Sequence, residues 1–115
     1  MKQIKYNWSE WYKLNNRYLL SKLIQNKSGV WVIRNNSKNI VYIGNSKNLK
    51  KRIIKDFLGS GKHSSRDRML NDKINLNELE FKFAYTEEYK FLKRILLEKY
   101  KKIYKKLPKY VKIIH

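Results

Sequence analysis

The chain has 115 residues, and its 28 Lys and Arg residues against 9 Asp and Glu give a formal net charge of +19. That charge indicates a polyanionic partner, while a hydrophobic content of 42% and an aromatic content of 14% exclude a disordered basic tail. The absence of cysteine excludes disulfides and Cys-based zinc sites, and the apolar runs are too short to span a membrane. We therefore expect one folded domain over residues 1–115, intracellular (cytoplasmic or nucleoid-associated), neither secreted nor membrane-bound.

Aromatic and leucine side chains recur at helical spacing near the start of the chain. Trp8, Trp11 and Tyr18 belong to this pattern, which predicts a helix over residues 8–24 with an aromatic stripe on one face. Aromatic residues at this period usually face inward, so we interpret the stripe as core packing in preference to a base-stacking platform. Residues 1–28 are thus predicted to form a helical extension ahead of a core over residues 29–111.

A β-hairpin and a second helix are predicted next. The short apolar runs 30–33 and 39–43 flank a polar turn, and because both are apolar on both faces we expect helices to cover each side. Leu49 and Phe57 lie on the apolar stripe of a helix predicted over residues 47–58, with Arg52 directed away from that stripe.

The remainder alternates between helix and strand. A flexible basic loop over residues 59–65 leads into a short helix over 66–73. Large apolar residues that alternate with Glu80, Lys82 and Ala84 predict a half-buried strand over 79–85. A long helix follows over residues 87–106. The fold class is therefore α+β, with a small three-stranded antiparallel sheet flanked by helices and an extra N-terminal helix.

Two triplets carry a resemblance to a known family. Gly29-Val30-Trp31 and Tyr42-Ile43-Gly44 are followed by the segment 46–52, which reads SKNLKKR, and by a glutamate late in the long helix before Pro108. Together they resemble the signature of the GIY-YIG nucleases over about residues 28–111. The segment 41–53 also looks like the nuclease subunit of bacterial nucleotide-excision repair. The resemblance implies the same α+β fold and a DNA endonuclease activity.

Phosphodiester hydrolysis needs a positioned water, a proton acceptor and positive charge to hold the phosphorane. The resemblance implies that Tyr42 orients or deprotonates the water and that Arg52 binds the phosphate, with neighbouring cations such as Arg52 and a metal ion expected to favour the Tyr42 phenolate. It makes Glu98 the ligand of one Mg²⁺ or Mn²⁺ ion, against the alternative of an i,i+4 ion pair with Lys102. His63 is a candidate for proton transfer, and the alternative is an exposed loop histidine that contacts a phosphate or nothing.

Three further residues are interpreted as structural at the site: Gly29, Gly44, which lets the chain turn closely from strand into helix, and Trp31. Trp31 stands where the family has tyrosine, and Val111 where it usually has asparagine. Because indole cannot ionise or accept a proton, Trp31 marks a departure from the family's chemistry. We expect the following basic residues to contact the nucleic-acid backbone: Lys47, Lys50, Lys51, Lys55, Lys62, Arg66 and Arg68.

The leading functional prediction is a metal-dependent DNA endonuclease acting on DNA that is branched or nicked, with a targeting protein as a further expected partner. Two alternatives stay open. One is a catalytically weakened nucleic-acid-binding module that keeps the fold and the charge, and the other is a basic RNA-binding protein.

Overall fold

A four-stranded antiparallel sheet forms the centre of the computed structural model, which describes residues 6–112. The strand order is β1–β4–β2–β3. The central strand β2 (Gly29–Arg34) pairs with β3 (Ile40–Ser46) on one side and β4 (Glu80–Tyr85) on the other, and β1 (Tyr12–Lys13) adds to β4. The predicted α+β class and hairpin are confirmed, and β1 is a short fourth strand that the sequence did not reveal.

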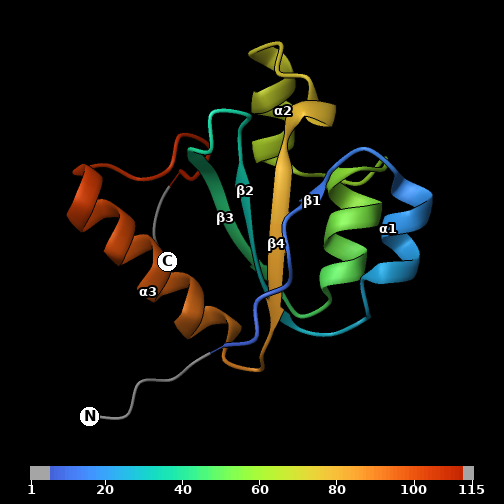
Figure 1. Cartoon of the computed structure of the whole chain (residues 1–115), viewed down its shortest axis with the longest axis horizontal. Helices are drawn as coiled ribbons and strands as arrows, with labels where there is room; N and C mark the ends of the chain where they lie inside the picture. The colour runs from blue at the N-terminus through green and yellow to red at the C-terminus, as the bar shows by residue number, and fades with distance from the viewer. Residues whose placement is uncertain (1–5, 113–115) are drawn as a thin grey trace.

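Helices cover both faces of this sheet. They are α1 (Arg17–Leu23), the π-type helix η1 (Lys51–Phe57), α2 (Ser64–Asn71), the short 3₁₀ turn η2 (Leu76–Glu78) and α3 (Tyr89–Tyr104). Figure 1 shows α3 on one side of the sheet and α1 with η1 on the other. Within the described range, no helix is long and apolar enough to span a membrane.

The predicted N-terminal helix over residues 8–24 is wrong in its first half. Asn16 begins α1, since its side chain accepts the N–H of Leu19 at 3.1 Å. Before Asn16 the chain is extended along β4, and the N–H of Ser9 donates to the carbonyl of Phe83 at 2.8 Å. Backbone pairing with the open edge of β4 therefore outweighs the helical spacing of the side chains.

The aromatic residues of that segment differ in how far they are buried. Trp8 and Trp11 are partly buried against the core, and the Lys82 ammonium lies 4.7 Å and 5.1 Å from their ring centroids. Tyr18, in contrast, is 68% exposed. Core packing is confirmed for the two tryptophans and wrong for Tyr18.

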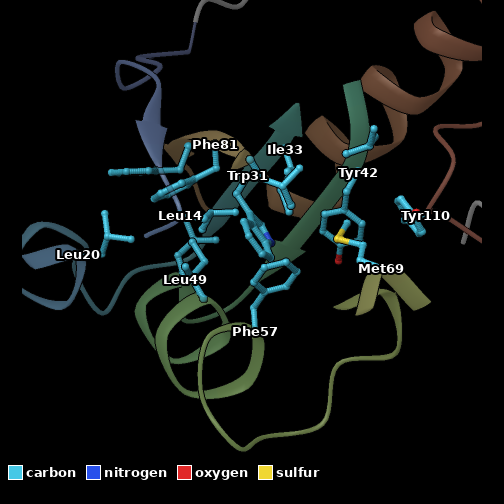
Figure 2. Close-up of a cluster of buried hydrophobic side chains, with 14 of the residues drawn as sticks. Leu14, Leu20, Trp31, Ile33, Tyr42, Leu49, Phe57, Met69, Phe81 and Tyr110 are labelled. Atoms are coloured by element: carbon cyan, nitrogen blue, oxygen red, sulfur yellow. The ribbon is translucent and has the colours of Figure 1, made fainter. Parts of the chain in front are cut away.

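Successive residues of β2 point to opposite faces of the sheet and enter two separate clusters. Val30 and Val32 join Ile43, Leu92 and Leu97 in an aliphatic layer beneath α3. The opposite face, towards η1 and α2, holds a larger cluster rich in aromatic rings, part of which is drawn in Figure 2: Trp31, Tyr42, Phe57 and Phe81, with Leu49, Met69 and Tyr110 around them.

A β-bulge in the edge strand β3 fixes the segment that follows α3. The register shifts between Ile33 and Arg34, so Val41 is an extra residue of β3 just before Tyr42. Its carbonyl accepts the N–H of Tyr110 at 3.0 Å. The Tyr110 hydroxyl donates to the carboxylate of Asp72, which helps raise the pKa of Tyr110 to about 12 after burial. The backbone around Tyr42 is therefore hydrogen-bonded to β2 on one side and, through Val41, to the segment at Tyr110 on the other.

Candidate active site

Tyr42 lies almost fully buried on β3, and its ring covers Gly44. A Cβ atom added at Gly44 would come within 2.5 Å of the Tyr42 ring and hydroxyl. We predicted that Gly44 serves a turn from strand into helix, but β3 continues to Ser46. Gly44 is needed because a side chain there would displace the Tyr42 phenol. Gly29 is structural as predicted, since a side chain there would collide with the carbonyl of Ala84.

Trp31 is the buried side chain against which the rings of Tyr42 and His63 pack. It is fully buried, and its ring centroid lies 5.3 Å from Tyr42, 6.0 Å from His63 and 5.1 Å from Phe57, all in edge-on arrangements. Its indole N–H has no hydrogen-bond partner in residues 6–112. Trp31 therefore contributes shape, as Figure 2 shows for its contacts with Tyr42 and Phe57.

His63 is 2% exposed, so the interpretation as a solvent-exposed loop histidine is wrong. It is the N-cap of α2, and its Nδ1 accepts the N–H of Arg66 at 3.2 Å. A neutral imidazole whose Nδ1 accepts must carry its proton on Nε2, which assigns the tautomer. Nε2 lies 3.5 Å from the Tyr42 hydroxyl oxygen and can donate to it.

Burial determines the charge state of both rings. Desolvation, followed by the positive charges of Arg52 and Arg66, lowers the pKa of His63 to about 4, so this histidine is neutral at pH 7. Burial also raises the pKa of Tyr42, and the opposing effect of Arg52 is smaller. The expected Tyr42 phenolate is therefore wrong for the free protein: Tyr42 is a neutral phenol that accepts from His63 and keeps its own proton to donate.

Arg52 is fixed at the same place from η1. Its Nη1 donates to the carboxylate of Asp56 at 3.1 Å and to the carbonyl of Lys62 at 3.0 Å. The side chain is 32% exposed. Since its charge acts on both Tyr42 and His63, the structure brings these three predicted residues together.

Glu98 is not part of this arrangement. It is exposed on α3, and at about 100° per residue it falls on the side of the helix opposite to Tyr89 and Leu96, which pack on the sheet. It also forms no ion pair with Lys102 in the described part of the chain.

Lys93 is a half-buried lysine that the sequence analysis did not single out. It lies on the sheet-facing side of α3 and has a pKa lowered by burial and then by the positive charge of Arg52. The available signal was a lysine placed inside the apolar stripe formed by Leu92, Leu96 and Leu97.

The predicted nucleic-acid contacts divide into two groups. Lys47, Lys51, Lys55 and Lys62 are exposed and Lys50 is half-buried. Arg66 instead donates to the carbonyls of Asp56, Phe57, Gly59 and Gly61 at 2.7–3.2 Å. Arg68 donates to the carbonyls of Lys109 and Tyr110 at 3.0 Å and 3.3 Å. These two guanidinium groups hold the loop 59–63 and the C-terminal segment.

Glu98 does not point towards Tyr42 and Arg52, because it is exposed on the side of α3 away from the sheet. Residues 6–112 contain no group of three or more His, Cys, Asp or Glu that could hold a metal ion through protein ligands alone. Magnesium can also be held by one or two carboxylates with water completing its coordination. The carboxylate that bonds Arg52 is that of Asp56.

A small antiparallel sheet with Tyr42 on its edge strand, followed by a helix carrying Arg52, defines a nuclease domain of the GIY-YIG class. The chain belongs to this family, since the family model described as the UvrC-like GIY-YIG domain matches residues 27–111.

Individual proteins support the same assignment. The chain is 38% identical over 66 residues (57% of the chain) to UvrABC system protein C of Bdellovibrio bacteriovorus, and 32% identical over 86 residues (72%) to that of Clostridium tetani. It covers only 10% and 13% of these proteins. The N-terminal GIY-YIG endonuclease domain of UvrC from Thermotoga maritima, in a form bound to its catalytic divalent cation, superposes with a TM-score of 0.58 at 24% identity, covering 86% of this chain and 98% of that one. This likeness shows a shared fold.

Proposed function

We propose that the protein is an endonuclease that hydrolyses phosphodiester bonds in DNA. The observation that carries the proposal is the convergence of Tyr42, His63 and Arg52 at the edge of β3 in a chain of a nuclease family. The net charge of +19 and the exposed lysines on and around η1 support a nucleic-acid substrate next to these residues.

In the proposed reaction, Arg52 grips the scissile phosphate and Tyr42 orients the attacking water. The Tyr42 oxygen accepts from His63 Nε2–H, so the phenol O–H is directed to the water or phosphate. The water oxygen bonds to phosphorus while the bond to the leaving oxygen breaks. The two protons of the water end on the phosphomonoester and on the released hydroxyl group. Arg52 stabilises the charge that builds on the phosphate.

A metal-dependent reaction with Mg²⁺ or Mn²⁺ was our expectation from the family resemblance. A bound divalent ion would supply Lewis-acid charge at the phosphate. Because Glu98 lies on the side of α3 away from the sheet, the steps above run through side chains alone, and the metal requirement is tested directly.

The test is cleavage of supercoiled plasmid and of branched and nicked DNA, each with Mg²⁺, Mn²⁺ or EDTA. We expect nicking by the unaltered protein, a loss of about 100-fold or more in Arg52→Lys because a lysine cannot make the bidentate contact, and a comparable loss in Tyr42→Phe. Lys102→Ala is the control, since it removes an exposed charge from α3 that is not among the predicted nucleic-acid contacts.

Two outcomes would contradict the proposal. Salt-sensitive binding without cleavage under any metal condition would favour the weakened binding module, for which Trp31 is the structural argument. Tighter binding to RNA than to DNA at matched salt would favour the RNA-binding protein.

A further inference from the structure

A groove of about 460 Å³ lies between the β2–β3 turn and the C-terminal end of α3. Figure 1 shows the chain after α3 running back towards that turn. The groove is within the size range of pockets that take small ligands. Its lining combines basic, aromatic and aliphatic side chains, among them Lys38, Lys106, Lys109, Tyr100, Tyr104 and Leu107, and no Asp or Glu of residues 6–112 lines it. Such a lining suits an anion that also carries a flat apolar part.

Tyr104 offers an exposed aromatic ring in this groove. Its side chain is 56% exposed, and its ring centroid lies 4.5 Å from that of Tyr100, with 37° between the ring planes. Tyr100 is in turn fixed to the sheet, because its hydroxyl donates to the carbonyl of Ile40 at 3.4 Å. Tyr100 therefore supports the Tyr104 ring from one side, and the exposed part of that ring is available for stacking.

The ammonium groups of the groove are free to bind phosphate. Lys106 forms no ion pair within the described part of the chain. The Nζ atoms of Lys38 and Lys109 lie 3.7 Å and 3.8 Å from carboxylate oxygens of Glu80 and Asp72, and the two lysine side chains are 66% and 68% exposed. Exposed ion pairs of this kind contribute little free energy, so phosphate oxygens can replace the carboxylates.

The β2–β3 turn holds Lys38 in an unusual backbone conformation. The side-chain oxygen of Asn35 accepts the N–H groups of Ser37 and Asn39, each at 3.0 Å, and the φ angle of Lys38 is 68°. Glycine or asparagine is favoured in this left-handed region. A lysine there has a conformational cost, and in return it places an ammonium group at the groove.

We propose that this groove binds an unpaired segment of DNA, with one base stacked on Tyr104 and the neighbouring phosphates on Lys38, Lys106 and Lys109. In a duplex the bases stack on one another, so only an unpaired base can present its face to a tyrosine. Val41 lines the groove and directly precedes Tyr42 on β3. The inference rests on the proposed nuclease function and names its substrate class: DNA with a single-stranded segment beside the bond that is cleaved.

The test for stacking compares the affinity of a labelled single-stranded DNA with that of a duplex of the same length, both in EDTA. We expect Tyr104→Ala to weaken single-strand binding about 10-fold, because one stacked base is lost, and to leave duplex binding unchanged. Tyr104→Phe keeps the ring and should bind as the unaltered protein does. Tyr18→Ala is the matched control, since Tyr18 is also exposed and has the Lys22 ammonium 4.4 Å from its ring centroid, but lies on α1.

The test for phosphate contacts follows the single-strand affinity against salt concentration. Loss of one contact reduces the slope of log affinity against log salt by about 0.7 for a single strand. We expect this reduction in Lys106→Gln and no change in Lys102→Gln. At about 100° per residue, Lys102 lies on the side of α3 opposite to Tyr100 and Tyr104, and it does not line the groove.

Three results would overturn the inference: equal losses in Tyr104→Ala and Tyr18→Ala, an equal loss of duplex binding in Tyr104→Ala, or an unchanged slope in Lys106→Gln. Tighter binding of single-stranded RNA than of the same DNA sequence, lost in Tyr104→Ala, would also overturn it and assign the groove to RNA. These measurements do not depend on cleavage. If the groove variants lose single-strand binding but the protein cleaves no DNA under any metal condition, the nuclease proposal fails and the binding site stands.

Discussion

The two faces of the sheet are built from different chemistry although the same strands supply both. The face beneath α3 is aliphatic, with Val30, Val32 and Ile43 against leucines. The face towards η1 and α2 places the polar tips of Tyr42 and His63 inside an aromatic cluster. Both faces therefore stabilise the fold, and the aromatic face also keeps two titratable rings in fixed positions.

Unpaired buried polar atoms do not distinguish the two faces. Within residues 6–112, the Trp31 indole N–H and the hydroxyl of Tyr6, which packs against the aliphatic cluster, both lack a hydrogen-bond partner. What distinguishes the aromatic face is that Tyr42 and His63 meet there at 3.5 Å, long for a hydrogen bond. Such a loose contact is typical of active sites, where catalytic hydrogen bonds often tighten only when substrate binds. Four changes can break or sharpen this contrast.

The largest effect is expected from Trp31→Ala. Removing a fully buried indole should lower the free energy of unfolding by about 3–5 kcal/mol, and it also frees Tyr42 and His63 to move, so cleavage should be lost even where the protein remains folded. The matched change on the other face is Leu92→Ala, expected to cost about 2–5 kcal/mol while preserving cleavage in the folded fraction. Urea unfolding with parallel activity assays compares them. Equal activity losses per folded molecule would contradict the contrast between the faces.

Gly44→Ala should have the next largest effect. Its Cβ would enter the space of the Tyr42 ring and force the phenol away from His63. Overpacking of this kind costs about 1–3 kcal/mol. We expect moderate destabilisation in thermal unfolding together with a loss of cleavage similar to that of Tyr42→Phe. A stable Gly44→Ala protein with full activity would show that the Tyr42 position is not essential.

The sequence predicts the features that are determined by residues close together in the chain, and it fails for those that depend on distant residues. The hairpin, η1 and α3 follow from turn residues and side-chain period, and the position of Arg52 follows from the motif around it. The segment 8–16 was mispredicted because its pairing partner, β4, lies about 70 residues away and offers backbone groups that no side-chain pattern reports. The burial of His63 depends on Trp31 and Phe57 from other elements. Glu98 was predicted from its place in the chain before Pro108. Whether a residue of α3 can reach the site depends instead on the side of the helix from which it points, and Glu98 points away from the sheet.

A smaller effect on stability is expected from the titration of His63. The pKa of His63 is about 4 when folded and about 6.5 when unfolded. Above pH 6.5 the ring is neutral in both states. Between pH 6.5 and 4 only the unfolded chain takes up the proton, so stability falls as the pH falls. Between pH 7 and 5 we expect a loss on the order of 1 kcal/mol from this residue, allowing for solvent screening.

The matched variant for that measurement is His63→Asn. Asparagine is a good N-cap, so it retains the hydrogen bond to the N–H of Arg66 and removes the titration, together with the Nε2 contact to Tyr42 and the ring packing of His63. Urea unfolding at several pH values should therefore show a flatter dependence in His63→Asn. An identical pH dependence in both proteins would contradict the assignment of a buried neutral His63.

The smallest effect is expected from Glu98→Gln, and it tests the contrast between positions on one helix. Since Glu98 is exposed on the side of α3 away from the sheet and forms no ion pair within residues 6–112, its loss should change stability by less than about 0.5 kcal/mol. Its removal should also leave cleavage within about twofold of the unaltered protein, far from the roughly 100-fold loss that removing a transition-state contact produces. A large loss in Glu98→Gln with unchanged unfolding would mean that α3 turns this carboxylate towards the phosphate when DNA binds. The charge at the reacting centre would then come from a metal ion after all.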